Sequence, residues 1–344
     1  MKKCAVVYNP NSGRKAKFNK MPQFIKMLNK YGYEVDIHYT EYKGHAIEIV
    51  KNLPDVDLVL SIGGDGTFNE SITGNYAREN RLVCAHIPVG TTNDIGIMMG
   101  YGKNMLNNLK MTLEGVVKGV DICLINNRPF VYVATIGKFA EIPYETPREL
   151  KKKFGYLAYI TEGAKSFFNK TKLYDVTYEI DGVEYRGLFS FIIISSANRI
   201  AGINNFYKDV KLDDNRFEVL LCNFSKKKDI IRSLYFLTLY DIEKVPGIHF
   251  YKTDKLKLRF AEVPKKNWCI DGEMLDDDGR NFDISIDKNI KMMIPRKNID
   301  KLFVNKKVWN IYWYFWLNYI KRFLGLGIIF VNLDLHVQNM LLDV

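Results

Sequence analysis

A glycine-rich turn that carries one carboxylate stands directly after an apolar run. Residues 56–62 read as a buried strand, and this strand leads into Gly63, Gly64, Asp65, Gly66 and Thr67. Because glycine has no Cβ, the backbone here can approach a ligand closely. Free N–H groups at the start of a helix favour phosphate, and Thr67 is placed to cap the helix that follows. An acid beside bound phosphates manages a metal ion or a proton, so the turn predicts a nucleotide polyphosphate site.

Two further polar loops follow predicted strands in the same way. A strand over residues 4–8 leads into Asn9, Pro10, Asn11, Ser12 and Gly13. A strand over residues 82–87 leads, after Pro88 and Val89, into Gly90, Thr91, Thr92, Asn93 and Asp94. Glycine, proline and asparagine also favour ordinary turns, so one such loop would carry little weight. Three of them, each at the carboxyl end of a strand, predict one shared ligand site.

The residues around these loops alternate between strand and helix patterns. Strands are predicted at 4–8, 33–40, 56–62 and 82–87, and helices at 18–30, 68–79 and 104–117. This alternation predicts an α/β fold whose first domain, residues 1–125, is a doubly wound, Rossmann-like nucleotide-binding sheet. The dinucleotide-binding fingerprint is not met, because Asn69 stands where its third glycine is needed, and no Walker sequence is present. The phosphates are therefore expected to be bound in another way.

After Asn126 the pattern changes to one of short strands. These strands are predicted at 130–136, 174–180, 185–195, 216–222, 255–260, 268–270 and 282–286, with one helix at 156–168. Turn signals such as Asp181-Gly182 separate several of them. The pattern predicts a second domain over residues 126–287, a β-rich sandwich.

Asp271, Gly272 and Glu273 lie between two of these predicted strands, and on their own they read as a hairpin turn. Together with the three loops, and with Asn69 and Glu70 after the second of them, they form a specific set of motifs. This set resembles the diacylglycerol kinase catalytic domain of bacterial lipid kinases. That family includes ceramide and sphingosine kinases, and its fold is shared more distantly with NAD kinases. The resemblance covers residues 1–303.

The resemblance implies that the first domain binds ATP together with Mg²⁺. It also implies that residues 288–304 return to this domain after the sandwich. The residues that it places at the nucleotide are Asn9, Pro10, Asn11, Ser12, Gly13, Thr40, Gly63, Gly64, Asp65, Gly66, Thr67, Asn69, Glu70, Gly90, Thr91, Thr92, Asn93 and Asp94.

Carboxylates supply the rest of the expected chemistry. Phosphoryl transfer needs Mg²⁺ to neutralise charge and a carboxylate to accept the proton of the hydroxyl. By resemblance this base is Asp271 or Glu273, and the spacing does not separate them, because both would point the same way on a regular strand. We expect Asp65 to be the other catalytic carboxylate, oriented toward the metal ion and the phosphates, with Asp94 in support.

An acidic turn in the second half raises a further metal site. Asp213 and Asp214 match a turn that holds a structural Mg²⁺ in some bacterial members of the family. The family usually has Asp-Gly where this chain has Asp214-Asn215, and asparagine tolerates the left-handed backbone that such a turn needs. The neighbouring residues 208–211 are basic, so this site stays open. A second departure is Ala201-Gly202-Ile203, where a glycine-rich run is common, and it weakens any transfer of lipid specificity.

The composition of the chain limits the classes of partner that we expect it to bind. The net charge of +11 suits an anionic partner, but no nucleic-acid-binding signature is present, so we expect no nucleic acid. The five cysteines are far apart, which predicts reduced thiols in a cytoplasmic protein. No uninterrupted apolar stretch is long enough to span a membrane.

Residues 305–344 form a tail beyond the resemblance. At helical spacing, Trp309, Trp313 and Trp316 lie on one face, and Lys321 and Arg322 lie on the other. Such a basic, aromatic amphipathic helix suits a membrane interface, so we expect peripheral association with the inner face of the cell membrane. The alternative is that this helix packs on its own domain or on a second subunit of a homodimer.

Together with these observations, the resemblance implies an ATP-dependent lipid kinase that transfers the γ-phosphate of ATP to a lipid hydroxyl. Diacylglycerol is the leading acceptor, which would give phosphatidic acid. An NAD kinase-like small-molecule kinase is one alternative, but it explains the Gly63–Thr67 turn and not the loop at Asn9 together with Asp271 and Glu273. A non-catalytic regulator that binds lipid or nucleotide is the other alternative, and the presence of all the expected carboxylates argues against it.

Overall fold

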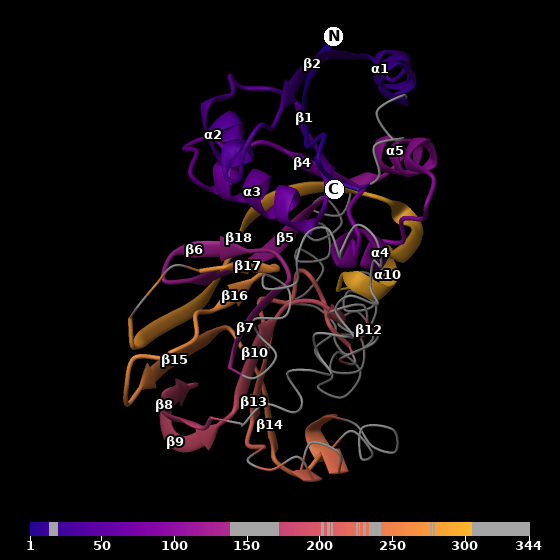
Figure 1. Cartoon of the computed structure of the whole chain (residues 1–344). Coiled ribbons are helices and arrows are strands. Elements are labelled where there is room, and N and C mark those ends of the chain that lie inside the picture. Colours follow the sequence, from indigo (N-terminus) through magenta and orange to yellow (C-terminus); the bar gives the residue numbers. More distant parts are fainter. Residues whose placement is uncertain are drawn as a thin grey trace, which may run out of the picture. The chain divides into compact units, whose positions relative to one another are not determined.

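Four parallel strands form the first part of a large mixed sheet (Figure 1). A computed structural model describes residues 1–13, 20–137, 172–200, 203–204, 207, 209–224, 226, 228–229, 232–233, 242–275, 277 and 279–304. The strands lie in the order β2-β1-β3-β4, and their bounds are β1 Lys2–Tyr8, β2 Tyr33–Tyr39, β3 Leu58–Gly63 and β4 Cys84–Pro88. β1 and β3 are buried along most of their length, which explains why they read as continuous apolar runs.

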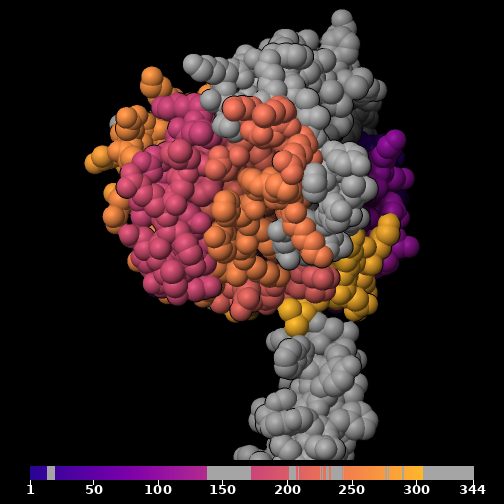
Figure 2. Space-filling model, turned by 90° about the horizontal axis from the view of Figure 1, so that it is seen from below, coloured from indigo at the N-terminus to yellow at the C-terminus, as the bar shows by residue number. Residues whose placement is uncertain are grey.

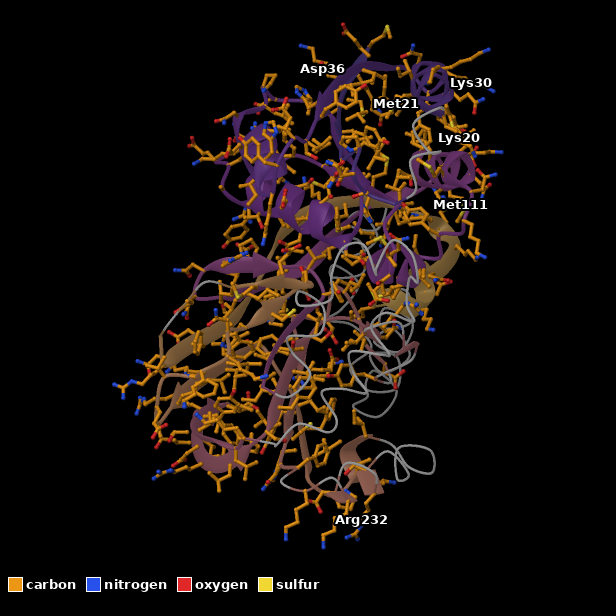
Figure 3. The ribbon with its side chains drawn as sticks, viewed as in Figure 1. Lys20, Met21, Lys30, Asp36, Met111 and Arg232 are labelled. Carbon is orange, nitrogen blue, oxygen red and sulfur yellow. The ribbon has the colours of Figure 1, made fainter. Side chains whose placement is uncertain are left out.

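Helices cover both faces of these parallel strands. α1 (Met21–Lys30) and α5 (Met105–Leu113) contact each other on one face, where Figure 3 labels Met21 and Lys30 on the first and Met111 on the second. Phe24, Leu28 and Leu109 are buried there against the sheet. α2 (His45–Asn52) and α3 (Asp65–Tyr76) pack on the other face through residues such as Val50 and Phe68. The predicted doubly wound α/β arrangement is confirmed.

One long strand joins this α/β part to the rest of the sheet. β18 (Asn281–Ile294) pairs in parallel with β4 through Met292 and Cys84, and it pairs antiparallel with β5 (Val116–Ile125). Its pairing with β5 shifts between Asp287 and Ile290. The sheet then continues through β15 (Lys255–Phe260), β8 (Tyr174–Ile180) and β9 (Val183–Phe189), with β6 (Arg128–Phe130) beside β5. The second half of β18 therefore returns to the parallel strands.

A second, antiparallel sheet packs on this extension. Its order is β14-β13-β10-β7-β16-β17, and its bounds are β14 Ile248–Thr253, β13 Phe217–Cys222, β10 Phe191–Ser195, β7 Val133–Gly137, β16 Cys269–Ile270 and β17 Glu273–Met274. Large side chains including Trp268, Phe217 and Phe282 fill the layer between the sheets. The view from below in Figure 2 shows sandwich strands, coloured rose to orange, at that surface. The predicted β-rich sandwich is confirmed.

Several short elements complete the described chain. They are α4 Asp94–Met98, a hairpin of β11 Arg199–Ile200 and β12 Ile203–Asn204, the 3-10 helices η2 Ile242–Lys244 and η3 Arg296–Asn298, and α10 Ile299–Leu302. Met1–Phe303 forms one compact unit. The boundaries expected after residue 125 and before residue 288 stay predictions, and β18 is continuous across the second of them.

Some boundaries differ from those read from the sequence. The strand expected at 130–136 is divided between β6 and β7, and the helix expected at 104–117 ends at Leu113 because Val116 already begins β5. α2 and β14 had not been expected. The helix predicted at 156–168, the run Ala201-Gly202 and the tail 305–344 lie outside the described residues.

Two predictions from composition can be compared with the structure. All five cysteines are buried free thiols, in agreement with the prediction of reduced thiols. Within the described residues, no helix has the length and apolar character needed to cross a membrane.

Candidate active site

The three polar loops after β1, β3 and β4 meet at one edge of the parallel sheet. The side-chain amide of Asn9 donates a hydrogen bond to Thr67 Oγ1 at 2.9 Å, which joins the first loop to the second. The backbone N–H of Val89 donates to the carbonyl of Gly63 at 2.7 Å, which joins the third loop to the second. The prediction that these loops share one edge is confirmed.

Close backbone approach explains the glycines in two of these loops. A Cβ on Gly90 would lie only 2.7 Å from the Cα of Gly64 and 2.9 Å from Oδ1 of Asn93. Asn93 has a left-handed backbone with a φ of 52°, and its side chain donates to the carbonyl of Gly90 at 3.0 Å. The loops are therefore in backbone contact, and any side chain at Gly90 would separate them.

α3 begins at Asp65 rather than at Phe68, so the acid stands in the first turn of the helix. The N-cap residue is Gly64, and it makes no side-chain capping bond. The expectation that Thr67 caps this helix is therefore wrong, because Thr67 lies inside the first turn and its hydroxyl accepts a hydrogen bond from Asn9. Because α3 begins at Asp65, the backbone N–H groups of Asp65 and Gly66 are among the first of the helix.

The carboxylate of Asp65 connects α3 to α4. It accepts hydrogen bonds from the backbone N–H groups of Asp94 at 3.0 Å and Ile95 at 3.3 Å. Burial, with the nearby carboxylate of Asp94, raises the pKa of Asp65 to about 7, although the two backbone donors oppose this rise. Positive charge next to Asp65 would therefore favour its ionised form.

Asp94 makes an ion pair with a residue of the sandwich part. Its Oδ1 accepts a hydrogen bond from Nε of Arg199, in β11, at 2.8 Å. The two side chains are only 1% and 12% exposed, so this pair is desolvated. Asp94 thus supports Asp65 through its backbone N–H, while its carboxylate contacts Arg199.

Asp271 is buried and fully hydrogen-bonded. Among the described residues, four donors reach its carboxylate: the backbone N–H groups of Val131, Tyr132 and Val133 at 2.6, 3.0 and 2.9 Å, and the side-chain amide of Asn69 at 2.7 Å. A carboxylate has about four lone-pair positions, so none remains for a substrate proton. Burial raises the pKa of Asp271, and these donors oppose that rise.

Glu273 has the opposite environment, although it is only two residues away. Its side chain is 39% exposed and pairs with Nζ of Lys43 at 2.7 Å. A Cβ placed on Gly66 would lie 3.5 Å from its Oε1, so Glu273 stands over the first turn of α3. Asp271 and Gly272, with φ values of 48° and 86°, form a tight turn between β16 and β17. The expectation that Asp271 and Glu273 share one face of a regular strand does not apply.

The remaining residues expected at the nucleotide have mixed roles. Glu70 accepts hydrogen bonds from the backbone N–H groups of Gly44 at 2.9 Å and Ala46 at 3.4 Å, so it holds the start of α2. The backbone N–H of Thr40 donates to the carbonyl of Tyr8 at 2.9 Å, which places Thr40 beside the first loop. Pro10, Asn11, Ser12, Gly13, Thr91 and Thr92 lie in the loops themselves.

The oxygen donors at this edge fit Mg²⁺ that arrives with a nucleotide. Mg²⁺ prefers oxygen ligands and is commonly held by one or two carboxylates together with substrate phosphates. Asp65 supplies such a carboxylate beside the phosphate-favouring first turn of α3. Within the described part of the chain, no group of three or more histidine, cysteine, aspartate or glutamate residues could hold a metal ion on its own.

The acidic turn at Asp213 and Asp214 packs elsewhere, on β5 and β14. The backbone N–H of Asn215 donates to Oδ2 of Asp121, and Asn215 has the left-handed backbone expected there, with a φ of 61°. Asp214 pairs with Nζ of Lys252 at 2.8 Å, so an ammonium group occupies part of its carboxylate. A structural Mg²⁺ at Asp213 and Asp214 stays a prediction.

Three residues of this site were missed in the sequence. Lys43 follows Thr40 closely but is part of no motif, and Arg199 lies 105 residues from its partner Asp94. Tyr132 is buried near three acids, because Asp65, Asp94 and Asp271 all contribute, after burial, to a pKa raised well above its usual value. None of these residues has a spacing signal, because each is brought to the site by tertiary packing.

Comparisons with known proteins agree with this geometry. Residues 3–125 match the family model described as the diacylglycerol kinase catalytic domain. A diacylglycerol kinase of Bacillus subtilis (strain 168) is 27% identical over 305 residues, which are 88% of this chain and 99% of that protein. A diacylglycerol kinase of Staphylococcus aureus (strain JH9) is 28% identical over 306 residues, which are 88% of this chain and 96% of that protein.

Solved structures show the same fold. The crystal structure of a diacylglycerol kinase from Bacillus anthracis str. Sterne has a TM-score of 0.71 at 22% identity and covers 87% of this chain and 99% of that chain. A second structure from the same organism has a TM-score of 0.74 at 21% identity and covers 87% of this chain and 97% of that one. The family match over residues 3–125, the two relatives and the described site agree, and together they support a lipid kinase with a catalytic domain of the diacylglycerol kinase type.

Proposed function

We propose that this lipid kinase transfers the γ-phosphate of ATP to a lipid hydroxyl, with Mg²⁺ as cofactor. Diacylglycerol is the acceptor that we propose first, because the two relatives compared above are named diacylglycerol kinases. The product would then be phosphatidic acid.

The observation that carries the proposal is the contrast between Asp271 and Glu273. Asp271 is only 3% exposed and its lone pairs are taken by four donors among the described residues, so it serves as a structural anchor. Glu273 is half-exposed and stands over Gly66, where the phosphate-favouring turn begins. A general base must reach the proton that it accepts, and only the second carboxylate meets this requirement. We therefore assign the base to Glu273.

The three loops support ATP as the phosphate donor. Gly64 and Gly90 keep the backbone of two loops bare of side chains where they touch, so a polyphosphate can lie close to the main chain. The first turn of α3 offers N–H groups and a favourable dipole to phosphate. Asp65 stands in the same turn and would hold Mg²⁺, which neutralises phosphate charge when bound.

The proposed transfer is a direct displacement. The oxygen of the lipid hydroxyl forms a bond to the γ-phosphorus, and the bond between that phosphorus and the β,γ-bridging oxygen breaks, so ADP leaves with the electron pair. The proton of the hydroxyl passes to the carboxylate of Glu273. Asn69, through Asp271, keeps the β16–β17 turn against α3 and so holds Glu273 in reach of the first turn.

The test is transfer of labelled γ-phosphate from ATP into a total lipid extract and into dispersed diacylglycerol, with E273Q beside wild type. We expect a labelled phospholipid that comigrates with phosphatidic acid, that is lost in E273Q and that is abolished by chelation of Mg²⁺. Labelled NAD in a parallel reaction, without labelled lipid, would contradict the proposal in favour of a small-molecule kinase. ATP binding without turnover of any acceptor would contradict it in favour of a regulator.

We also propose that the enzyme meets its acceptor at a membrane surface, since the acceptor is itself a bilayer lipid. The basic and aromatic residues of the 305–344 tail support this proposal. Cosedimentation with anionic liposomes should be strong for the full chain and weak after deletion of residues 305–344. Equal binding by the two proteins would contradict a role for the tail.

A further inference from the structure

A closed circuit of contacts links α3 to the base. Two neighbouring residues of α3 point to different partners: Asn69 donates to Asp271, and Glu70 accepts from the backbone N–H of Gly44. Asp271 is the first residue of the turn that leads to Glu273, and Gly44 directly follows Lys43 in the chain. The ion pair between Lys43 and Glu273, at 2.7 Å, joins the segment at Gly44 to the turn at Asp271.

The Lys43–Glu273 pair is the exposed link of this circuit. Lys43 is 58% exposed and Glu273 is 39% exposed, whereas the bond between Asn69 and Asp271 is buried. An exposed ion pair contributes little free energy, so it opens at small cost while the buried link persists. The circuit can therefore release Glu273 without separating the turn from α3.

Glu273 is the acid that pairs with Lys43, and Glu70 lies in the same region of the site. Burial raises the pKa of Glu70, the backbone N–H groups of Gly44 and Ala46 oppose this rise, and the charges of Glu273 and Lys43 have smaller effects. Lysine has a flexible four-carbon stem, so the ammonium group of Lys43 can leave Glu273.

We propose that Lys43 is a positioning residue that occupies Glu273 until the acceptor hydroxyl displaces it, and that it thereby suppresses transfer of phosphate to water. The inference rests on the proposed role of Glu273 as the base. An ammonium group on a carboxylate oxygen blocks that oxygen and offsets its negative charge. Oε2 is then occupied and only Oε1, over Gly66, remains for a water molecule, whereas a bound lipid hydroxyl competes with the ammonium group for the carboxylate.

Loss of this contact would allow a defined side reaction. The oxygen of a water molecule would form a bond to the γ-phosphorus of ATP, and the bond from that phosphorus to the β,γ-bridging oxygen would break. The water proton would pass to Glu273 and then to solvent, and the products would be ADP and inorganic phosphate. The reaction is therefore read as ATP hydrolysis in the absence of lipid.

The experiment compares K43M, K43R and K257M with wild type in the full chain. K43M keeps most of the side-chain length without charge, and K43R restores the charge. K257M is a matched control, because Lys257 pairs with Glu179 at 3.1 Å with side chains 63% and 38% exposed, on β15 and β8 of the sandwich. For each protein we measure release of phosphate from Mg·ATP without lipid, and phosphorylation of dispersed diacylglycerol.

We expect lipid-independent hydrolysis to rise about two- to fivefold in K43M, which is the range that an exposed ion pair allows, and to stay at the wild-type level in K43R and K257M. Hydrolysis that is unchanged or lower in K43M would overturn the inference, since Lys43 would then be inert or would serve the phosphates directly. An equal rise in K257M would also overturn it. Failure of wild type to phosphorylate any lipid, with hydrolysis still raised in K43M, would instead overturn the proposed acceptor.

Discussion

The side-chain amide of Asn69 donates a hydrogen bond to the carboxylate of Asp271 at 2.7 Å, although 202 residues separate them in the chain. Asn69 belongs to α3, which carries Asp65 at its start, and Asp271 begins the turn that carries Glu273. This buried bond therefore holds the turn that carries Glu273, the base that we propose, against the helix that begins at Asp65. It also gives Asp271 buried surroundings, while Glu273, two residues away, is partly exposed.

Replacement of Asp271 should mainly lower the stability of the folded protein. D271A removes a buried carboxylate on which four donors of the described residues converge and leaves three backbone N–H groups without that acceptor. Alanine also tolerates the φ of 48° poorly. We expect the free energy of unfolding to fall by about 3 kcal/mol, since each unpaired buried group costs roughly 1–3 kcal/mol. Urea denaturation measures this change.

Replacement of Glu273 should lower the activity strongly and change the stability of the protein little. E273A breaks an exposed ion pair, so the free energy of unfolding should change by less than about 1 kcal/mol. Lipid phosphorylation should fall by roughly 10²- to 10⁴-fold, which is the usual contribution of a general base. A stable D271A enzyme that has lost all turnover, beside an active E273A enzyme, would reverse our assignment of the base.

Contact between two loops makes Gly90 intolerant of a side chain. The Cβ of G90A would stand 2.7 Å from the Cα of Gly64, and this neighbour is backbone that cannot rotate away. We expect KM for ATP to rise at least about tenfold, because a shift of the loops misplaces the phosphate contacts. G102A is the matched control, since a Cβ on Gly102 meets nothing within 4 Å. Equal KM values for G90A and wild type would show that the contact does not shape the nucleotide site.

Local patterns in the sequence predicted much of this fold. β8 and β15 have the predicted bounds, because one face of each strand is buried and the residues alternate strictly. The meeting of the three loops was also predictable, because the carboxyl ends of neighbouring parallel strands share one sheet edge. α2 was missed because its eight residues are too few for a clear helical period.

The roles of individual acids were not predictable in the same way. The donors to Asp271 come from Val131, Tyr132 and Val133, which lie 138 to 140 residues away, and they use the backbone, which has no sequence signal. The cation at Asp94 is likewise supplied by Arg199 from the other part of the molecule. Spacing predicted that these carboxylates lie near one another, but tertiary contacts decide which of them is buried and which stays exposed.

Loss of Arg199 should destabilise the protein more than loss of an exposed arginine. R199M removes the cation that faces the buried carboxylate of Asp94, and breaking a buried pair costs about 3–5 kcal/mol. R186M is the control, because Arg186 pairs with Asp175 at the surface and should cost no more than about 1 kcal/mol. The measurement is again urea denaturation. Equal losses in the two variants would mean that the Arg199 pair is not desolvated in solution.

Glu218 should make the stability of the protein depend on pH. Burial first, and then the charge of Asp214, raises its pKa to about 7 from an ordinary value of 4.5, while Lys252 opposes this rise. Between these two values the folded state binds more protons than the unfolded state, so the free energy of unfolding falls as pH rises from 4.5 to 7. E218Q does not titrate and should lack this fall.

The difference in unfolding free energy between E218Q and wild type should therefore grow in favour of the variant, by about 3 kcal/mol between pH 4.5 and pH 8. Denaturation curves of both proteins across this range measure it, and taking the difference cancels groups such as His86. The pKa of this buried histidine is lowered to about 3, and it titrates alike in both proteins with the opposite sign. A difference that stays constant with pH would mean that Glu218 is solvated in solution and that Lys252 balances it fully.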